Sequence, residues 1–317
     1  MHRIGIDIRL LYYRAGGIAA YMRHLSEALA ALHPPQQFML LHNFRMGETL
    51  APGPNFRRAN ALTPSHHRWE ALALSAELLP RRLDLWHSPD FIPPRWGARR
   101  YVITVHDLAF LRYPDIQTAD SLRYYAGGIR RAVRQADAII AVSGATRDDL
   151  IELVGADAEK IHVIWEGISD HFAPRPSAEI DAVRARYNLP AEYLLFVGTL
   201  EPRKNIPNML RAYAQLRAAS AQVPPLVLAG QKGWLSDDIF ETITALNLQE
   251  AVQWIGAVPF ADLPALYSGA VVHILVSQYE GFGFPPLEAL ACGTPTVVSA
   301  RGALREVTGE AGVYADP

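Results

Sequence analysis

Two glutamates that flank a glycine-rich segment are the residues with the clearest capacity for chemistry. Glu280 and Glu288 stand eight positions apart, and Gly281 and Gly283 follow the first of them. Carboxylates accept hydrogen bonds from neighbouring hydroxyls of a sugar or ribose, and glycines let a ligand approach the backbone closely. The alternative is that Glu288 only complements a helix dipole and that Glu280 is solvated. We expect the pair to face one ligand.

A helix is predicted to begin at Pro285 and Pro286, directly after the glycine-rich segment. The free N–H groups of a helix start attract phosphate. Proline has no N–H to offer. The donors expected here are therefore those of Gly281, Phe282, Gly283, Phe284 and Leu287.

Two cations form a second candidate site. Arg203 and Lys204 lie between a predicted strand at 193–199 and a predicted helix. Ligands of parallel α/β sheets bind beyond the carboxyl ends of the strands, so this loop is expected to meet the ligand. The pair can neutralise a diphosphate and the charge that grows as a sugar–phosphate bond breaks. A merely solvated pair is the alternative, although cations near a helix N-terminus oppose its dipole. Glu201 either orients Arg203 or is exposed.

A histidine ends a predicted strand in the first half of the chain. His106 belongs to the apolar run 101–107, and at a carboxyl end it would face the ligand. The alternative is a core histidine whose ring is satisfied by backbone groups. His87 ends the run 84–88 with the same geometry, and we interpret it as structural.

Metal binding is not expected. The sequence offers no Asp-x-Asp after a strand and no His-x3-His on one helix face. Cys292 is the one cysteine, which excludes a disulfide scaffold and a cysteine-ligated zinc site. Its apolar surroundings predict a small buried hydrophobic residue.

The apolar pattern predicts alternating strands and helices that would position these side chains. Its runs are too continuous for a half-exposed antiparallel sheet and favour parallel strands buried on both faces. In the first half, strands are expected at residues 3–8, 38–43, 84–88, 101–107, 138–143 and 161–167. Helices are expected after Gly16 and Gly17 and at residues 68–79, 118–135 and 145–154.

A stretch with two prolines at 171–179 is typical of a linker, and the alternation then starts again. Further strands are expected at residues 193–199, 226–230, 252–256, 271–277 and 294–299. The expected helices follow Asn205 and Ser236 and cover residues 260–268 and 285–292. The pattern predicts an α/β protein with two Rossmann-like, doubly wound domains facing a cleft, residues 1–172 and 173–317. That cleft is the default ligand site.

Composition indicates a packed globular protein. The 317 residues are half hydrophobic and one fifth charged, and the length suits two domains of about 150 residues. No apolar run approaches the about 18 residues of a membrane span, so a cytoplasmic setting is expected, free in the cytosol or at the inner face of the membrane.

The charge differs between the two halves. Residues 1–150 hold 19 arginines and no lysine against 13 acidic residues, a net +6, whereas residues 151–317 carry −8. The basic half either meets an anionic partner, such as a membrane surface, or attracts the acidic half. No basic run alternates with aromatic residues, so nucleic acid is not an expected partner. The helix at 68–79 either lies on anionic lipid, with Arg81 and Arg82 at its end, or is an ordinary core helix.

Two segments resemble a known family. EGFGFPPLEALACGTPTVVS at 280–299 is similar to the Glu-x7-Glu signature of retaining glycosyltransferases of family 4, which have the GT-B fold. GTLEPRKN at 198–205 resembles the family's second donor-binding segment. The pattern is closest to the mannosyltransferase-like branch that works on lipid-linked or capsular glycans. Weaker similarities lie at residues 16–25, 105–114, 141–150 and 161–172.

The resemblance implies metal-independent, retaining transfer of a hexose, with mannose favoured, to a glycan or lipid-linked acceptor. GDP-mannose is favoured over a UDP-sugar as the donor, and no cofactor is implied. The C-terminal domain would bind the nucleotide, with Glu288 on the ribose and Glu280 on the sugar hydroxyls. Arg203 and Lys204 would bind the diphosphate, and further donor contacts are implied for Gly17, Gly198, Thr199, Gly281, Phe282, Gly283 and Phe284.

The family also implies a role for the N-terminal domain, which would bring the acceptor and His106. The equivalent histidine contacts the transferred sugar near the reacting carbon. With Glu280, Arg203 and Lys204, His106 completes the implied catalytic set. A front-face route is implied, in which the leaving phosphate accepts the proton of the acceptor.

One departure from the family concerns the C-terminus. The sequence stops at AGVYADP, where family members usually continue through further helices. A truncated chain, or a partner that covers the exposed apolar surface, is therefore expected. Alternative functions are a sugar-nucleotide epimerase or phosphorylase of the same architecture and a non-catalytic binding subunit.

Overall fold

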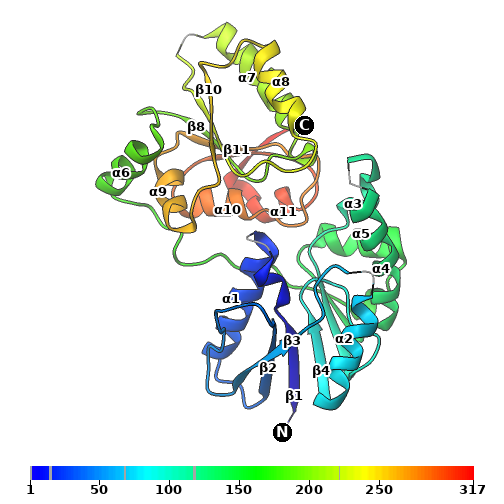
Figure 1. Ribbon diagram of the computed structural model, residues 1–317. Helices are drawn as coiled ribbons and strands as arrows, with labels where there is room; N and C mark the ends of the chain where they lie inside the picture. The colour runs from blue at the N-terminus through cyan, green and yellow to red at the C-terminus, as the bar shows by residue number, and fades with distance from the viewer. Residues whose placement is uncertain (1, 14–15, 68, 117–118, 221) are drawn as a thin grey trace. The chain divides into compact units, whose positions relative to one another are not determined.

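The computed structural model describes residues 2–13, 16–67, 69–116, 119–220 and 222–317. The chain divides into two compact units, Met1–Glu166 and Gly167–Pro317. Each unit contains one parallel sheet with helices packed on both of its faces (Figure 1). The predicted fold class, two doubly wound α/β sheets, is confirmed.

The N-terminal unit holds a seven-stranded parallel sheet with the order β3-β2-β1-β4-β5-β6-β7. Its strands are β1 (Arg3–Asp7), β2 (Gln37–Asn43), β3 (Phe56–Ala61), β4 (Leu83–Ser88), β5 (Ala98–Val105), β6 (Ala138–Ala141) and β7 (Ile161–Val163). Its helices are α1 (Gly17–Ala31), α2 (Glu70–Leu78), α3 (Ala109–Arg112), α4 (Ala119–Gln135) and α5 (Gly144–Val154).

Neighbouring residues of β2 show how both faces of this sheet are buried. Successive side chains of a strand point to opposite faces. Leu40 packs in a cluster with Met22 of α1, whereas Leu41 packs in another with Leu74 of α2. Both leucines are fully buried. The continuous apolar run therefore reflects helices on both sides, as expected for parallel strands.

The C-terminal unit holds a six-stranded parallel sheet with the order β10-β9-β8-β11-β12-β13. Its strands are β8 (Leu194–Val197), β9 (Leu226–Ala229), β10 (Val252–Gly256), β11 (Val272–Leu275), β12 (Thr296–Ser299) and β13 (Gly312–Ala315). Its helices are α6 (Ser177–Tyr187), α7 (Ile206–Ala219), α8 (Asp237–Ala245), α9 (Leu263–Ser268), α10 (Phe284–Ala291) and α11 (Leu304–Thr308).

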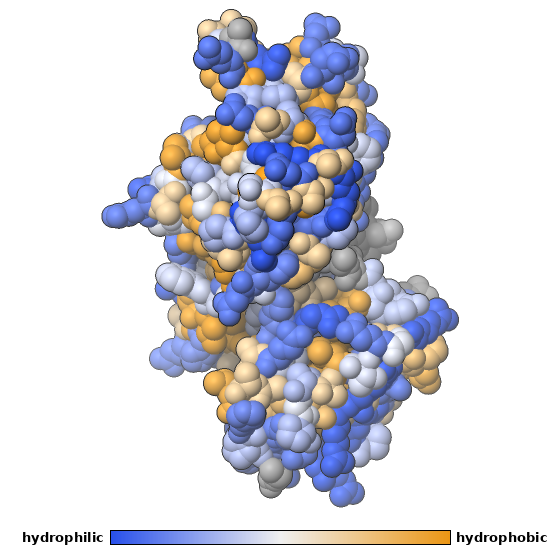
Figure 2. All heavy atoms as spheres, turned by 90° about the vertical axis from the view of Figure 1, so that its left-hand side faces the viewer, coloured by the Kyte–Doolittle hydropathy of each residue, from blue (hydrophilic) through white to orange (hydrophobic). Residues whose placement is uncertain are grey.

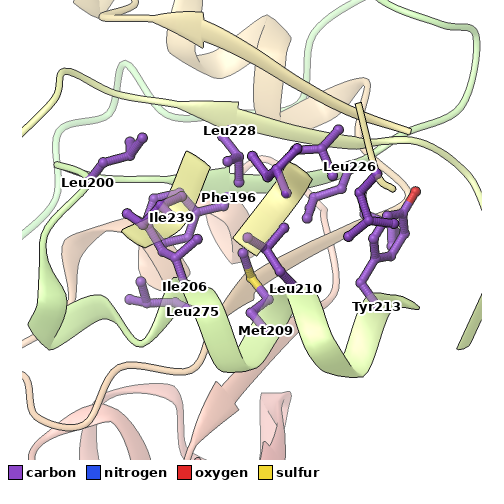
Figure 3. Packing of buried hydrophobic residues seen from close by; sticks show 14 of the residues in the cluster. Phe196, Leu200, Ile206, Met209, Leu210, Tyr213, Leu226, Leu228, Ile239 and Leu275 are labelled. Atoms are coloured by element: carbon purple, nitrogen blue, oxygen red, sulfur yellow. The ribbon is translucent and has the colours of Figure 1, made fainter. Parts of the chain in front are cut away.

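One core layer of this unit lies between its sheet and helix α7. Figure 3 shows Phe196 and Leu228 of the sheet packed against Met209 and Leu210 of that helix. The opposite face of the sheet packs in a separate cluster that includes Cys292, which is 3% exposed. The prediction that this cysteine is a buried hydrophobic residue is confirmed.

Five of the helices and strands named above were not predicted: β3, α6 and β13, and the short helices α3 and α11. Strand β3 has the sequence FRRANA at the edge of its sheet, and its polar residues hide the strand from an apolar pattern. Helix α6 begins inside the predicted linker, and β13 is the short edge strand of the second sheet. Strand β5 ends at Val105, so His106 follows the strand instead of ending it.

The helix considered for lipid binding is a core helix. Leu74 and Leu78 of α2 are fully buried, which supports the core-helix alternative, whereas Trp69 and Leu79 at its two ends are exposed. The face drawn in Figure 2 mixes hydrophobic and hydrophilic residues. Within the described ranges, no helix is long and apolar enough to cross a bilayer.

Candidate active site

Adjacent strands bring the predicted cations and Glu280 together. β8 and β11 are parallel neighbours, so their carboxyl ends lie at the same edge of the sheet. Arg203 and Lys204 belong to the short helix η5 (Pro202–Lys204) that follows β8, and Glu280 lies in the loop after β11. Asn205 has a φ of 57°, a left-handed conformation that asparagine tolerates, and it separates η5 from α7.

The carboxylate of Glu280 is the centre of a hydrogen-bonded network. Nζ of Lys204 and Oγ of Ser277 both donate to its Oε1, each at 2.6 Å. NH1 of Arg203 donates to its Oε2 at 2.8 Å. The same guanidinium binds Oε1 of Glu201 through Nε at 3.1 Å and NH2 at 2.9 Å. Glu201 therefore orients Arg203, which is the first of the two alternatives left open by the sequence.

Electrostatics keeps Glu280 ionised. Burial alone would raise the pKa of this carboxyl, but Arg203 and Lys204 outweigh burial and lower the pKa to about 2. A carboxylate offers about four acceptor positions, and three of those of Glu280 already receive a donor. Glu280 therefore holds the two cations in place and has about one position left for a ligand hydroxyl.

A glycine on another loop lets the Glu280 backbone sit where it does. Gly302 has a φ of 59°, and a Cβ built on it would lie 2.5 Å from the carbonyl oxygen of Glu280. The N–H of Ala303 donates to that same carbonyl at 3.0 Å. Only glycine fits this close approach without moving the loop that carries the carboxylate.

Glu288 lies on helix α10, and its side chain accepts a hydrogen bond from a tyrosine. The hydroxyl of Tyr267 donates to Oε2 of Glu288 at 2.8 Å. Burial raises the pKa of Glu288 to about 7, although the Tyr267 hydrogen bond opposes the shift. This carboxyl therefore gains or loses its proton near neutral pH. Among the described residues, no hydrogen bond or ion pair joins it to Glu280.

The glycine-rich segment forms the start of α10. The helix begins at Phe284 with Gly283 as its N-cap, and Pro285 and Pro286 follow in its first turn. Gly281 and Phe282, which follow Glu280 in the chain, are buried. Gly198 and Thr199, the other residues expected at the donor, directly follow β8.

An oxygen atom lies close to each of the two ring nitrogens of His106. Its Nδ1 lies 3.0 Å from Oε1 of Glu166, and its Nε2 lies 2.8 Å from the carbonyl oxygen of Pro89. Burial lowers the pKa of His106, but Glu166 outweighs burial and raises it. Because two acceptors flank the ring, the arrangement favours the imidazolium. The ring is also in edge-to-face contact with the ring of Tyr21, and the two ring centroids lie 5.0 Å apart.

The remaining predicted residues of the N-terminal unit have local roles. Gly17 is the first residue of α1, and Gly16 is its N-cap. Nε2 of His87 lies 2.8 Å from Oγ1 of Thr104, and burial lowers the pKa of this histidine to about 4. His87 is thus a neutral, hydrogen-bonded core residue.

Ser277, Tyr267 and Glu166 were not singled out from the sequence. Ser277 ends a predicted strand, and that position could have indicated it. Tyr267 and Glu166 act through contacts with residues far along the chain or on other elements, for which the sequence gives no local signal. The described residues contain no group of three or more His, Cys, Asp or Glu that could hold a metal ion.

Comparisons with known protein families cover both units. The family described as Glycosyltransferase Family 4 matches residues 15–172, and the family described as Glycosyl transferases group 1 matches residues 179–315. The solved structure of sucrose-phosphate synthase from Thermosynechococcus elongatus has a TM-score of 0.79 and 23% identity, over 100% of this chain and 86% of that one. This likeness shows the GT-B fold.

Two proteins of similar sequence are also glycosyltransferases. The chain is 32% identical over 323 residues to O-antigen chain mannosyltransferase B of Escherichia coli, covering 96% of this chain and 84% of that protein. It is 35% identical over 245 residues to D-inositol 3-phosphate glycosyltransferase of Kineococcus radiotolerans, covering 71% of this chain and only 56% of that protein. The chain therefore belongs to glycosyltransferase family 4, whose members are retaining enzymes with the GT-B fold that transfer a sugar from a nucleotide sugar.

Proposed function

We propose that the protein transfers mannose from GDP-mannose to a hydroxyl group of a growing glycan chain. The choice of mannose and of a glycan acceptor is supported by the similarity to an O-antigen chain mannosyltransferase over 96% of this chain. The observation that carries the donor site is the buried network of Glu280, Arg203 and Lys204 at the carboxyl ends of β8 and β11.

In this proposal the cations bind the diphosphate of the donor. An ammonium has three N–H donors, and the hydrogen bond from Lys204 to Glu280 uses one of them. Glu280 prevents the cations from moving apart and accepts one hydroxyl of the sugar. The ionised form of Glu288 accepts hydrogen bonds from the ribose hydroxyls.

The chemical step needs no nucleophile from the protein. The bond between the sugar anomeric carbon and the diphosphate oxygen breaks, and the acceptor oxygen forms a bond to that carbon on the same face. The acceptor proton passes to the leaving phosphate oxygen. Arg203 and Lys204 stabilise the negative charge that grows on the phosphate. His106, as an imidazolium whose two ring nitrogens face Glu166 and Pro89, contributes positive charge and no hydrogen bond to the transferred sugar.

Thermal unfolding with nucleotides tests the donor site. A ligand that binds only the folded protein raises its melting temperature. We expect GDP and GDP-mannose to raise the melting temperature more than UDP and UDP-glucose do. Lys204→Met should abolish the shift, whereas Arg217→Met should retain it. Arg217 is the control because it lies exposed in the last turn of α7, away from the helix start that follows Lys204.

A transfer assay tests the reaction. Incubation with GDP-mannose and mannose-terminated oligosaccharides should give a longer glycan whose new linkage has the anomeric configuration of the donor sugar, as read by NMR. A larger shift with UDP-sugars would overturn the choice of nucleotide. An inverted linkage, or release of free mannose alone, would overturn the proposed reaction.

A further inference from the structure

Helices α9 and α10 lie side by side on one face of the second sheet, and a hydrogen bond between two of their side chains joins them (Figure 1). The hydroxyl of Tyr267, near the end of α9, donates to Oε2 of Glu288 on α10 at 2.8 Å. Among the described residues, no hydrogen bond or ion pair occupies the other oxygen of Glu288, Oε1. The contact therefore fixes one carboxylate oxygen and leaves the second for a ligand hydroxyl.

The side chain of Tyr267 is held rigidly. It is completely buried and packs edge to face with Phe172 and His273, with ring centroids 6.1 Å and 5.7 Å away. The backbone carbonyl of Tyr267 accepts a hydrogen bond from Oγ1 of Thr294 at 2.6 Å, and the N–H of Thr294 donates to the carbonyl of Ala289 on α10 at 2.9 Å. A tyrosine side chain has two torsions, so this packing also fixes the position of its hydroxyl.

The side chain of Glu288 would be more mobile without this contact. Glu288 is half-buried, and its third torsion has no sharp minimum of its own. A carboxylate that samples several orientations must be ordered when a ligand binds, and that ordering weakens binding. The hydrogen bond from Tyr267 orders the carboxylate before the ligand arrives.

The hydroxyl of Tyr267 is a donor near neutral pH. Burial and the nearby Glu288 raise the pKa of Tyr267 well above its ordinary value. Burial raises the pKa of Glu288 as well, and the hydrogen bond from Tyr267 opposes that rise, so the bond favours the ionised carboxylate. Burial lowers the pKa of His273 to about 3 and raises the pKa of Cys292 to about 11, so these two neighbours are neutral near pH 7.

We propose that Tyr267 is a positioning residue for donor binding, which presents Oε1 of Glu288 to the ribose hydroxyls of the nucleotide sugar. The inference rests on the proposed function and deepens it, because it names a side chain behind the donor contacts on which recognition of the ribose depends. The hydroxyl of Tyr267 is bonded to Glu288 and its ring lies in the core. Its contribution is therefore confined to ligands that carry ribose hydroxyls.

Two nucleotides that differ in the ribose hydroxyls test the inference on the full chain. The probes are GDP and 2′,3′-dideoxy-GDP, and isothermal titration calorimetry at mildly alkaline pH, where Glu288 is ionised, gives their dissociation constants. We expect the wild type to bind GDP at least about tenfold more tightly than the dideoxy nucleotide. Tyr267→Phe keeps the buried ring and should reduce this ratio to less than about threefold by weakening GDP alone.

A control and a double variant separate positioning from a loss of packing. Tyr213→Phe removes a buried tyrosine hydroxyl from the core layer on the other face of the same sheet, and it should keep the wild-type ratio. Glu288→Ala should bring the two nucleotides to nearly equal affinity. Adding Tyr267→Phe to Glu288→Ala should then change GDP binding by less than about twofold, because residues that act through one another are not additive. A tyrosine that only packs in the core would weaken both nucleotides in either background.

The pH profile of the same ratio gives a further readout. Both nucleotides carry the same phosphates, so the ratio cancels their titration. In the wild type the ratio should rise as the pH increases through about 7, where Glu288 ionises. Without the hydrogen bond from Tyr267 the pKa of Glu288 is higher, so any residual rise in Tyr267→Phe should occur at higher pH.

The outcomes distinguish this inference from the proposed function. An unchanged ratio in folded Tyr267→Phe, or additive losses in the double variant, overturns the role of Tyr267 alone. A wild type that binds GDP and its dideoxy analogue equally tightly overturns the ribose contact of Glu288 and the inference with it. A wild type that binds UDP in place of GDP overturns the proposed nucleotide alone, and UDP with 2′,3′-dideoxy-UDP then measures the same ratio.

Discussion

Replacing Glu288 by glutamine should stabilise the protein at alkaline pH. Burial raises the pKa of this carboxyl from 4.5 in the unfolded chain to about 7 in the fold. The folded protein therefore binds the proton more tightly than the unfolded chain does. The stability that this neutral form contributes is complete below about pH 4.5 and is lost as the pH rises through about 7.

The size of the effect follows from the two pKa values. Each pKa unit corresponds to about 1.4 kcal/mol, so ionisation of Glu288 costs up to about 3 kcal/mol near pH 8. Glutamine removes this cost and can still accept the Tyr267 hydrogen bond through its carbonyl oxygen. In a unit of this size, about 3 kcal/mol corresponds to roughly 6–12 °C in melting temperature.

Differential scanning calorimetry of the wild type and Glu288→Gln across pH measures this prediction. The difference in melting temperature should be small below about pH 4.5, should grow between about pH 4.5 and 7, and should level off toward pH 8. Glu241→Gln, an exposed carboxylate on α8 of the same unit, is the control and should show no such growth. A difference that does not change with pH would refute the reasoning.

Three further predictions concern other buried contacts. Arg9→Met leaves two buried carboxylates, those of Asp7 and Glu70, without their cation and should lower the unfolding free energy of the N-terminal unit by about 3–5 kcal/mol, as measured by calorimetry; a loss below about 1 kcal/mol would contradict it. Gly302→Ala places a methyl group against the backbone of Glu280 and should reduce the thermal shift by GDP at least severalfold, and an unaltered shift would show that the loop adjusts freely. Glu166→Gln removes the charge that raises the pKa of His106, so the NMR titration midpoint of that ring should move to lower pH, and an unchanged midpoint would exclude the ion pair.

The sequence predicted the parts of the fold that depend on local pattern. Continuous apolar runs located the central strands, because helices cover both faces of each sheet. The edge strand β3 was not predicted, because half of its side chains are polar and it pairs with a neighbouring strand on one side alone. Helix α6 was hidden by the prolines that precede its first residue, Ser177.

The part of the candidate site that could be predicted is the part that depends on the carboxyl ends of parallel strands meeting at one edge of the sheet. This rule predicted that Arg203, Lys204 and Glu280 meet the same ligand. It did not reveal that Glu280 binds the cations themselves, because the lengths of two loops decide that contact. The cluster around Arg9 was missed for the same reason, since an arginine after a strand is usually solvent-exposed.

Each of the hydrophobic clusters draws all its residues from one unit. Phe172 packs with Tyr193 and Leu266, so a junction at Glu166–Gly167 leaves every core intact. Segments exchanged at that peptide bond keep their own packing. Recombination between relatives at this junction can therefore join units of different origin and still yield two folded halves, so each half of such an enzyme can change in evolution without the other.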